Sequence, residues 1–162
     1  MPIIALALMC PALVGCSPTP EPTPTPTPAF ASEEEAFAAA EETYRAYNEA
    51  GNTTGDGIDF LTGSALEGEL ATTRYLQENG LTLEGASEIE SFTGLEIDVG
   101  AANVVIQARV CVDVSNVVVL NRSGDDVTPI DRVDLLALDV TFVRTETELL
   151  IAKSEAVGDP TC

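Results

Sequence analysis

The chain of 162 residues contains no histidine and no tryptophan. Without histidine, a serine or cysteine nucleophile lacks the base that activates it in the usual triads, so hydrolases of that form are excluded. Zinc is not expected for the same reason, because histidine is one of its main ligands. The sequence also has no phosphate-binding loop and no dinucleotide-binding glycine motif. We therefore expect neither a metal ion nor a cofactor.

Basic residues are scarce as well. Seven lysine and arginine residues stand against 27 aspartate and glutamate residues, which gives a formal net charge of −20. A field of this sign opposes binding to nucleic acid and to anionic lipid headgroups, and the sequence contains no basic patch that would favour either. We interpret most of the carboxylates as groups that keep the surface solvated.

An apolar stretch at the N-terminus, residues 3–14, is too short to cross a bilayer, which needs about 20 residues. It ends in Leu-Val-Gly-Cys at residues 13–16. This order resembles the signal peptide and lipobox of a bacterial lipoprotein, although no lysine or arginine precedes the apolar stretch. The resemblance implies removal of residues 1–15, a lipid such as palmitate on Cys16, and attachment to the extracytoplasmic face of the cell membrane. The alternative is a buried N-terminal helix with a core cysteine, which Pro2 and Pro11 disfavour.

Proline and threonine dominate residues 17–28. Alternating prolines fix φ and remove hydrogen-bond donors, so the stretch favours an extended polyproline II conformation of about 3.1 Å per residue. We therefore divide the chain into a signal peptide (1–15), a lipidated cysteine with a Pro/Thr-rich linker (16–30) and one folded domain (31–162).

Cysteine is rare, and its count is informative. After loss of the signal peptide the chain keeps Cys16, Cys111 and Cys162. If Cys16 is acylated, one pair remains, and outside the cytoplasm such a pair favours a disulfide. The alternative is a metal-binding or redox pair, which the lack of histidine and of a C-x-x-C motif disfavours.

Two helices are predicted at the start of the domain. Ser32 and Glu35 form a capping box for the first helix, which should end at Gly51. A second capping box, Ser64 and Glu67, begins a helix that should stop at Gly80. The apolar positions recur every three or four residues in both segments, as in amphipathic helices; they are Phe37, Ala40, Tyr44 and Tyr47, then Leu66, Leu70 and Leu76.

From residue 86 onward the apolar period changes to two, which is typical of strands. The expected strands cover residues 95–99, 104–114, 132–144 and 148–157, and residues 117–120 continue the second of them past a bend. Short connections make antiparallel neighbours. Helices first and antiparallel strands afterwards predict an α+β fold, with the helices packed on one face of the sheet.

The chain is identified by resemblance as a member of the NTF2-like (cystatin-like) cone proteins, in which N-terminal helices close a curved antiparallel sheet. More narrowly it resembles the NTF2-like lipoproteins of actinobacteria. The segments that carry this resemblance, besides the lipobox and linker, are 40–47, 62–66, 111–115 and 158–162. The resemblance implies a pairing of Cys111 with Cys162 and implies no reaction. The chain departs from the group at Glu148-Leu149-Leu150, where a tryptophan is common.

Enzymes of this cone fold include ketosteroid isomerases, in which a carboxylate moves a proton beside an apolar pocket. Asp113 or Asp139 could serve as such a base, with Tyr44 or Tyr47 donating a hydrogen bond to an oxyanion. The competing interpretation places both aspartates on the solvated face of the sheet. Two acidic loops, 52–59 and 121–131, lack the calcium-binding spacing of an EF-hand and are interpreted as solvated turns.

We expect a non-enzymatic, membrane-anchored extracytoplasmic domain that binds a small apolar ligand or an envelope protein. One alternative is an enzyme of the isomerase or dehydratase type that uses a buried aspartate with a tyrosine. The other is a structural or accessory subunit that forms a homodimer. A deep pocket with Asp113 or Asp139 pointing into it would favour the enzyme.

Overall fold

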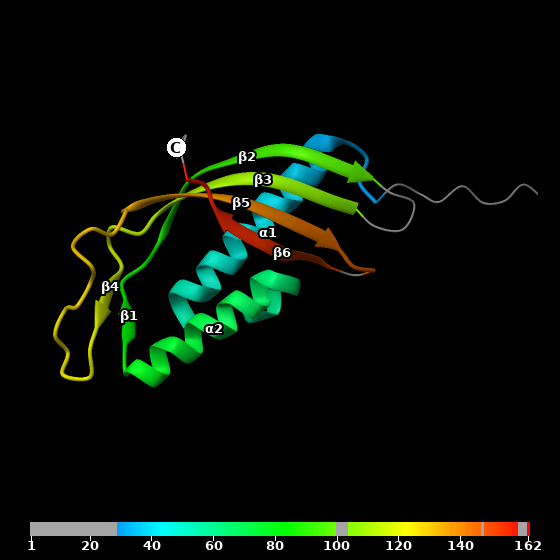
Figure 1. Cartoon of the computed structure of the whole chain (residues 1–162). Helices are drawn as coiled ribbons and strands as arrows, with labels where there is room; N and C mark the ends of the chain where they lie inside the picture. Colours follow the sequence, from blue (N-terminus) through cyan, green and yellow to red (C-terminus); the bar gives the residue numbers. More distant parts are fainter. Residues whose placement is uncertain (1–28, 100–103, 147, 159–161) are drawn as a thin grey trace, which may run out of the picture.

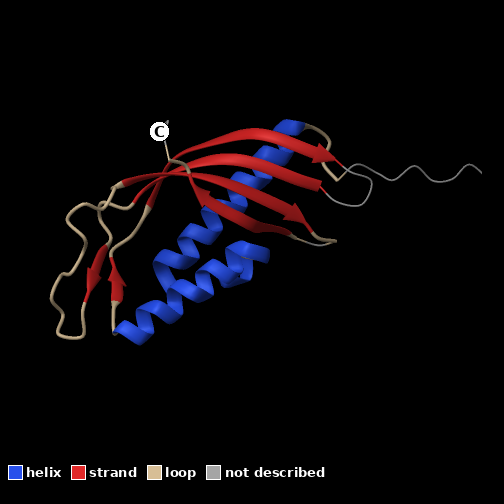
Figure 2. Cartoon of the chain, in the orientation of Figure 1, coloured by secondary structure: helices blue, strands red, loops and turns tan. Residues whose placement is uncertain are grey.

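The computed structural model describes residues 29–99, 104–146, 148–158 and 162. Cys16, the predicted signal peptide and most of the linker lie outside the described residues. The described part is an α+β domain, as predicted, with two α-helices under one face of a curved antiparallel sheet (Figures 1 and 2).

In chain order the described elements are α1 (Glu33–Thr54), the 3-10 helix η1 (Ile58–Phe60), α2 (Gly63–Asn79), β1 (Thr82–Glu84), β2 (Glu88–Val99), β3 (Val104–Asp113), β4 (Val118–Leu120), β5 (Leu135–Arg144) and β6 (Leu149–Ala156). Neither α1 nor α2 combines the length and the hydropathy that a membrane-spanning helix needs.

Helix α1 begins where the sequence predicts and ends later. The hydroxyl of Ser32 accepts a hydrogen bond from the Glu35 backbone N–H at 3.2 Å, which caps the first turn. The predicted end at Gly51 is wrong, because the helix continues to Thr54 and ends at Gly55 in the left-handed conformation, with φ of 69°. Asn52 explains the extension: its side-chain amide exchanges two hydrogen bonds with the backbone of Ser87, of 2.8 and 3.0 Å, which hold the last turn against the loop before β2.

Helix α2 begins two residues earlier than predicted. Its N-cap is Thr62, so the predicted capping box of Ser64 and Glu67 is wrong. The hydroxyl of Ser64 instead donates to the carbonyl oxygen of Ala152 in β6 at 3.3 Å. The backbone N–H of Thr62 likewise donates to the carbonyl oxygen of Ile151 at 2.8 Å. Pairing with β6 therefore sets the start of α2, and its end at Gly80 is confirmed.

The main sheet has the order β2-β3-β5-β6, with every neighbouring pair antiparallel. Register shifts in β2, between Ile89 and Ser91 and between Gly94 and Glu96, accompany the curvature of the sheet in Figure 2. Residues 118–120 do not continue β3 as predicted. They pair as β4 with β1 in a separate two-stranded sheet, because the chain turns away at Ser115 and Asn116 and meets the segment that follows α2.

The core lies between α1 and the concave face of the sheet. Small side chains on α1, Ala36 and Ala40, are buried at 1% and 0% exposure and let the helix approach the strands closely. A glycine in β2 has the same effect, since a Cβ at Gly94 would lie 2.3 Å from the ring of Phe37. The largest fully buried side chains come from β3, β5 and β6; they are Phe142, Ile106, Ile151, Val110 and Val140.

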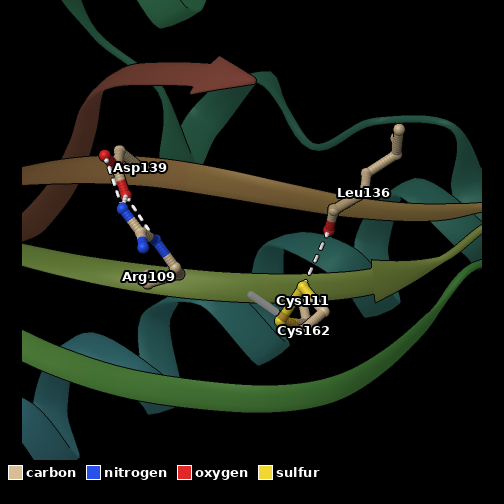
Figure 3. The surroundings of a disulfide bond; sticks show 5 residues. All are labelled: Arg109, Cys111, Leu136, Asp139 and Cys162. Atoms are coloured by element: carbon tan, nitrogen blue, oxygen red, sulfur yellow. Dashed lines mark hydrogen bonds and ion pairs between the residues drawn. A yellow bond between two sulfur atoms is a disulfide. The ribbon is translucent and has the colours of Figure 1, made fainter. Parts of the chain in front are cut away.

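A disulfide on the opposite, convex face joins Cys111 in β3 to the C-terminal Cys162 (Figure 3). Side chains alternate along a strand, and Val110 and Val112 belong to the core, so Cys111 points away from the helices. Its Cα lies 5.7 Å from that of Cys162. The bond fastens the last residue of the chain to the centre of the sheet.

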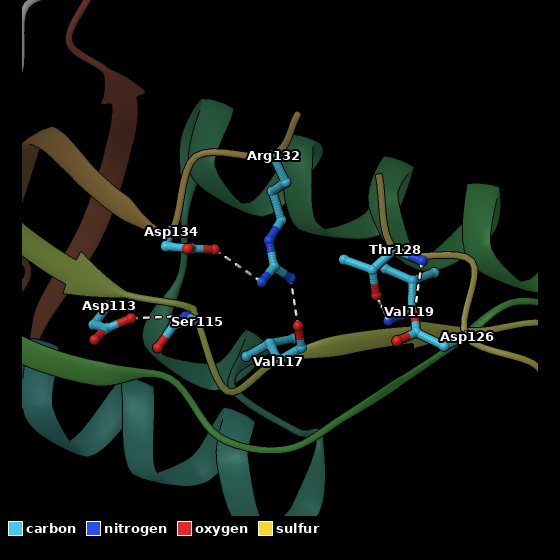
Figure 4. A network of polar contacts seen from close by, with 8 residues as sticks. All are labelled: Asp113, Ser115, Val117, Val119, Asp126, Thr128, Arg132 and Asp134. Atoms are coloured by element: carbon cyan, nitrogen blue, oxygen red, sulfur yellow. Dashed lines mark hydrogen bonds and ion pairs between the residues drawn. The ribbon is translucent and has the colours of Figure 1, made fainter. Parts of the chain in front are cut away.

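The small sheet and its loop, residues 82–84 and 114–134, form a lobe at one end of the domain (Figure 1). Arg132 holds the base of this lobe together. One of its terminal nitrogens donates to the carbonyl oxygen of Val117, and the other lies 3.2 Å from Asp134 (Figure 4). Thr128 braces β4 by accepting a hydrogen bond from the Val119 N–H at 2.8 Å.

We predict that Cys162→Ser lowers the free energy of unfolding by up to about 4 kcal/mol, the loop-closure value for a bond between residues 51 positions apart. Urea unfolding in the absence of reductant measures the loss. Wild-type protein treated with dithiothreitol is the matched control and should unfold at the same urea concentration as the variant. Equal midpoints for the variant and the oxidised wild type would show that the bond contributes nothing.

Candidate functional site

A cavity of about 220 Å³ lies between the two helices and the β6 edge of the sheet. Apolar side chains line part of it, namely Leu61, Ala65, Leu138 and Ile151. Polar side chains line the rest, namely Tyr44, Tyr47, Ser64, Glu69 and Ser154, and Gly68 completes the wall. The volume is below the range of about 300–1,000 Å³ found for drug-sized ligands, so the cavity suits a smaller molecule.

The local fold keeps the cavity open. Helix α1 contacts β2, β3 and β6, whereas α2 contacts β6. The two helices therefore share β6 as a support, with α2 fixed to it through Thr62 and Ser64. None of the residues of α2 is fully buried, although Ala65 and Leu66 pack against the core.

Gly68 is one of the residues that line the cavity. It lies in the interior of α2, where glycine is less favourable than alanine by about 1 kcal/mol. A Cβ built on Gly68 would have nothing within 4 Å, so close packing does not require glycine there. Any larger side chain at this position would stand at the cavity wall.

Two tyrosines of α1 enter the cavity from one side. The rings of Tyr44 and Tyr47 meet edge to face, with centroids 5.7 Å apart and an interplanar angle of 63°. Tyr44 is 5% exposed, and neither hydroxyl has a hydrogen-bond partner among the described residues. The pKa of Tyr44 is raised mainly by its burial and secondly by the neighbouring Tyr47. The pKa of Tyr47 is also raised mainly by burial, and secondly by the negative charge of Glu69. Both phenols are therefore neutral at physiological pH and free to donate or accept.

Glu69 supplies the only ionisable carboxylate of the cavity lining. No lysine or arginine lines the cavity, and within the described residues Glu69 takes part in no ion pair. The site thus combines a carboxylate that has no basic partner with two tyrosine hydroxyls and an apolar wall. Chemically it can accept hydrogen bonds from a donor, accommodate positive charge and cover a compact apolar group.

The structure places the predicted aspartates elsewhere. Val140 and Phe142 belong to the core, so Asp139 points to the convex face, where it forms an ion pair with Arg109 at 2.8 Å (Figure 3). Asp113 also lies on that face. Its carboxylate accepts a hydrogen bond of 2.7 Å from the Ser115 N–H (Figure 4). The pKa of Asp113 is lowered mainly by this backbone hydrogen bond and secondly by the side chain of Ser115.

Asp113 and Asp139 are therefore not brought together with Tyr44 and Tyr47. The arrangement that the enzymatic alternative requires, an aspartate beside a tyrosine in an apolar pocket, is not assembled from these residues. The carboxylate that does accompany the tyrosines is Glu69, which sequence reasoning missed. The helical spacing of the two tyrosines indicates one side of the site, but no local signal in the sequence points to Glu69.

The two acidic loops have local structural roles. Asn52 belongs to α1 and bonds to Ser87, as described above. In the second loop, the side-chain oxygen of Asn121 accepts hydrogen bonds from the N–H groups of Ser123 and Asp125 at 2.8 and 3.0 Å. No cluster of three or more potential metal-binding side chains occurs in the part of the chain that the structure describes.

Several large apolar side chains are exposed outside the cavity. Two lie on α2, Leu70 and Tyr75, and others lie on the lobe, namely Leu83, Val127, Ile130 and Val133. Ile130, beside Pro129 in the lobe's loop, is fully exposed. Isolated apolar side chains of this kind are common on protein surfaces and do not by themselves define a site.

No protein-family model and no curated protein matches the chain. Among solved structures, the intermembrane space region of chloroplast protein ARC6 is similar, with a TM-score of 0.53 and 10% sequence identity. The match covers 80% of this chain and 99% of that chain. At this identity the likeness concerns the fold alone.

We predict that the free energy of unfolding falls as pH rises above about 10, because unfolded tyrosine loses its proton near that pH while buried Tyr44 retains it. The proton retained by Tyr44 contributes a slope of about 1.4 kcal/mol per pH unit, and Tyr44→Phe should remove this contribution while that of Tyr47 remains. Urea unfolding at several pH values above and below this point measures the slope. Tyr75→Phe, at a position 59% exposed, is the control and should keep the wild-type slope. An unchanged slope in Tyr44→Phe would contradict the assignment.

Proposed function

We propose that this protein is a membrane-anchored, extracytoplasmic lipoprotein whose NTF2-like cone binds a small ligand in the cavity between α1, α2 and β6. The observation that carries the proposal is the combination in one cavity of unpartnered tyrosine hydroxyls, an unpaired carboxylate and an apolar wall. The helices on the concave face of a curved antiparallel sheet support the cone, as does the sequence resemblance. No reaction is part of the proposal.

Binding is favoured over catalysis by the position of the charged groups. Asp113 and Asp139 lie on the convex face, away from the cavity. Glu69 could in principle accept a proton and the tyrosine hydroxyls could donate to an oxyanion, but no second carboxylate and no basic side chain is among the lining residues. A site with one carboxylate and two neutral hydroxyls is sufficient for recognition.

The attachment of the N-terminal segment is consistent with a tether. Arg144, at the end of β5, donates to the carbonyl oxygen of Ala29 at 3.1 Å and covers the ring of Phe30 at 4.8 Å. The linker therefore meets the domain at the end opposite the lobe (Figure 1). A lipid on Cys16 would place this end toward the membrane and the lobe away from it.

We predict that Gly68→Leu abolishes binding of small probes without unfolding the protein, because the new side chain enters open space at the cavity wall. Cyclohexylamine and cyclohexanol are suitable probes, since neither absorbs where tyrosine does. The chain has three tyrosines and no tryptophan, so tyrosine fluorescence reports on Tyr44 and Tyr47 directly, above all in a Tyr75→Phe background. At least one probe should give a saturable change in the wild type, with a Kd of roughly 1 mM or lower.

Gly51→Leu is the matched control, because Gly51 also lies inside a helix with nothing within 4 Å of its Cβ position but does not line the cavity. It should bind the probes as the wild type does. The proposal fails if neither probe gives a saturable change, or if Gly68→Leu binds as well as Gly51→Leu.

We predict that Cys16→Ser abolishes incorporation of labelled palmitate and releases the protein from the membrane fraction. Cys10→Ser is the control, since Cys10 lies in the predicted signal peptide and carries no lipid in the mature protein. Metabolic labelling followed by fractionation measures both effects. Palmitate that remains on Cys16→Ser protein would contradict the anchor.

A further inference from the structure

The charge of the cavity points to one class of ligand. Glu69 places a negative charge at the lining, and none of the seven basic residues of the chain is among the lining residues. An anionic ligand would therefore meet a carboxylate of the same charge with no basic side chain in the lining to offset it, which is unfavourable. A ligand that brings a positive charge would supply the partner that Glu69 lacks.

The tyrosines favour the same class. The faces of aromatic rings attract cations through the ring quadrupole, and tyrosine hydroxyls add oxygen atoms that accept hydrogen bonds from an ammonium group. Tyr44 and Tyr47 both line the cavity, and their two hydroxyls have no partner within the described residues. Because the phenols stay neutral, Glu69 is the only lining group that carries charge.

The shape and surroundings of the cavity narrow the class further. Leu61, Leu138 and Ile151 offer an apolar wall, and the volume of about 220 Å³ admits only a compact molecule. A metal ion is a poor alternative, since a single carboxylate cannot supply the several charged ligands that divalent ions prefer. The net charge of −20 also raises the local concentration of cations and lowers that of anions.

We propose that the cavity selects a small organic cation, an ammonium group on a compact apolar body, with Glu69 as its counter-ion and Tyr44 and Tyr47 beside the charge. This inference rests on the proposed ligand-binding function and adds the chemical class of the ligand.

The test compares cyclohexylamine, which is a cation at neutral pH, with cyclohexanol, which has the same ring and no charge. Tyrosine fluorescence of the purified protein at pH 7 follows both titrations. We expect the amine to bind roughly tenfold more tightly than the alcohol, as for a hydrogen bond to a charged group. Glu69→Gln should remove most of this difference by weakening the amine, and should affect binding of the alcohol much less.

Glu67→Gln is the matched control, because Glu67 lies on the same helix, is exposed and does not line the cavity. It removes the same charge from the protein, so a general attraction of cations to the acidic surface would fall equally in both variants. Equal affinity for amine and alcohol in the wild type, or equal effects of Glu67→Gln and Glu69→Gln, would overturn the cation inference while leaving ligand binding intact. Absence of saturable binding by both probes would instead reject the proposed function itself.

Discussion

The close seating of α1 in the concave face of the sheet is the constraint on which the rest of the structure depends. Ala36 and Ala40 bring the helix close to the strands, and Gly94 leaves room for Phe37. The next residue on this face is Tyr44, whose ring is buried while its hydroxyl finds no protein partner. Helix α2 is anchored to β6 through the Ser64 hydroxyl, and a space remains beside Tyr44 between the two helices. The cavity is thus a consequence of how two helices share one strand.

The sequence predicts the architecture well because its signals are local. The serine before α1, the glycine after α2 and the alternating apolar residues of β3 each act over a few positions. Where the prediction is wrong, a long-range contact decides the outcome. Asn52 and Ser87, 35 residues apart, carry α1 past Gly51. The pairing of Thr62 with β6 displaces the start of α2 from Ser64, and the pairing of β4 with β1 removes residues 118–120 from the main sheet.

The candidate site could be predicted only in part. In β3 the strict alternation already places Asp113 opposite the core, whereas β5 carries apolar residues on both faces and leaves the direction of Asp139 undetermined from sequence. Tyr44 and Tyr47 were candidates because of their helical spacing. Glu69 was one of 27 acidic residues, and nothing local distinguishes it from Glu67. Only the three-dimensional arrangement, in which α2 lies beside β6, shows that Glu69 lines the cavity and Glu67 does not.

The central claim is that the cavity holds a small cationic ligand, and a crystal structure of the protein grown with cyclohexylamine tests it most directly. We predict electron density for the amine between α1 and α2, with its nitrogen within about 3 Å of the Glu69 carboxylate and its ring against Leu138 and Ile151. A cavity closed by movement of α2 onto α1, or an amine bound only at other acidic side chains, would contradict the claim.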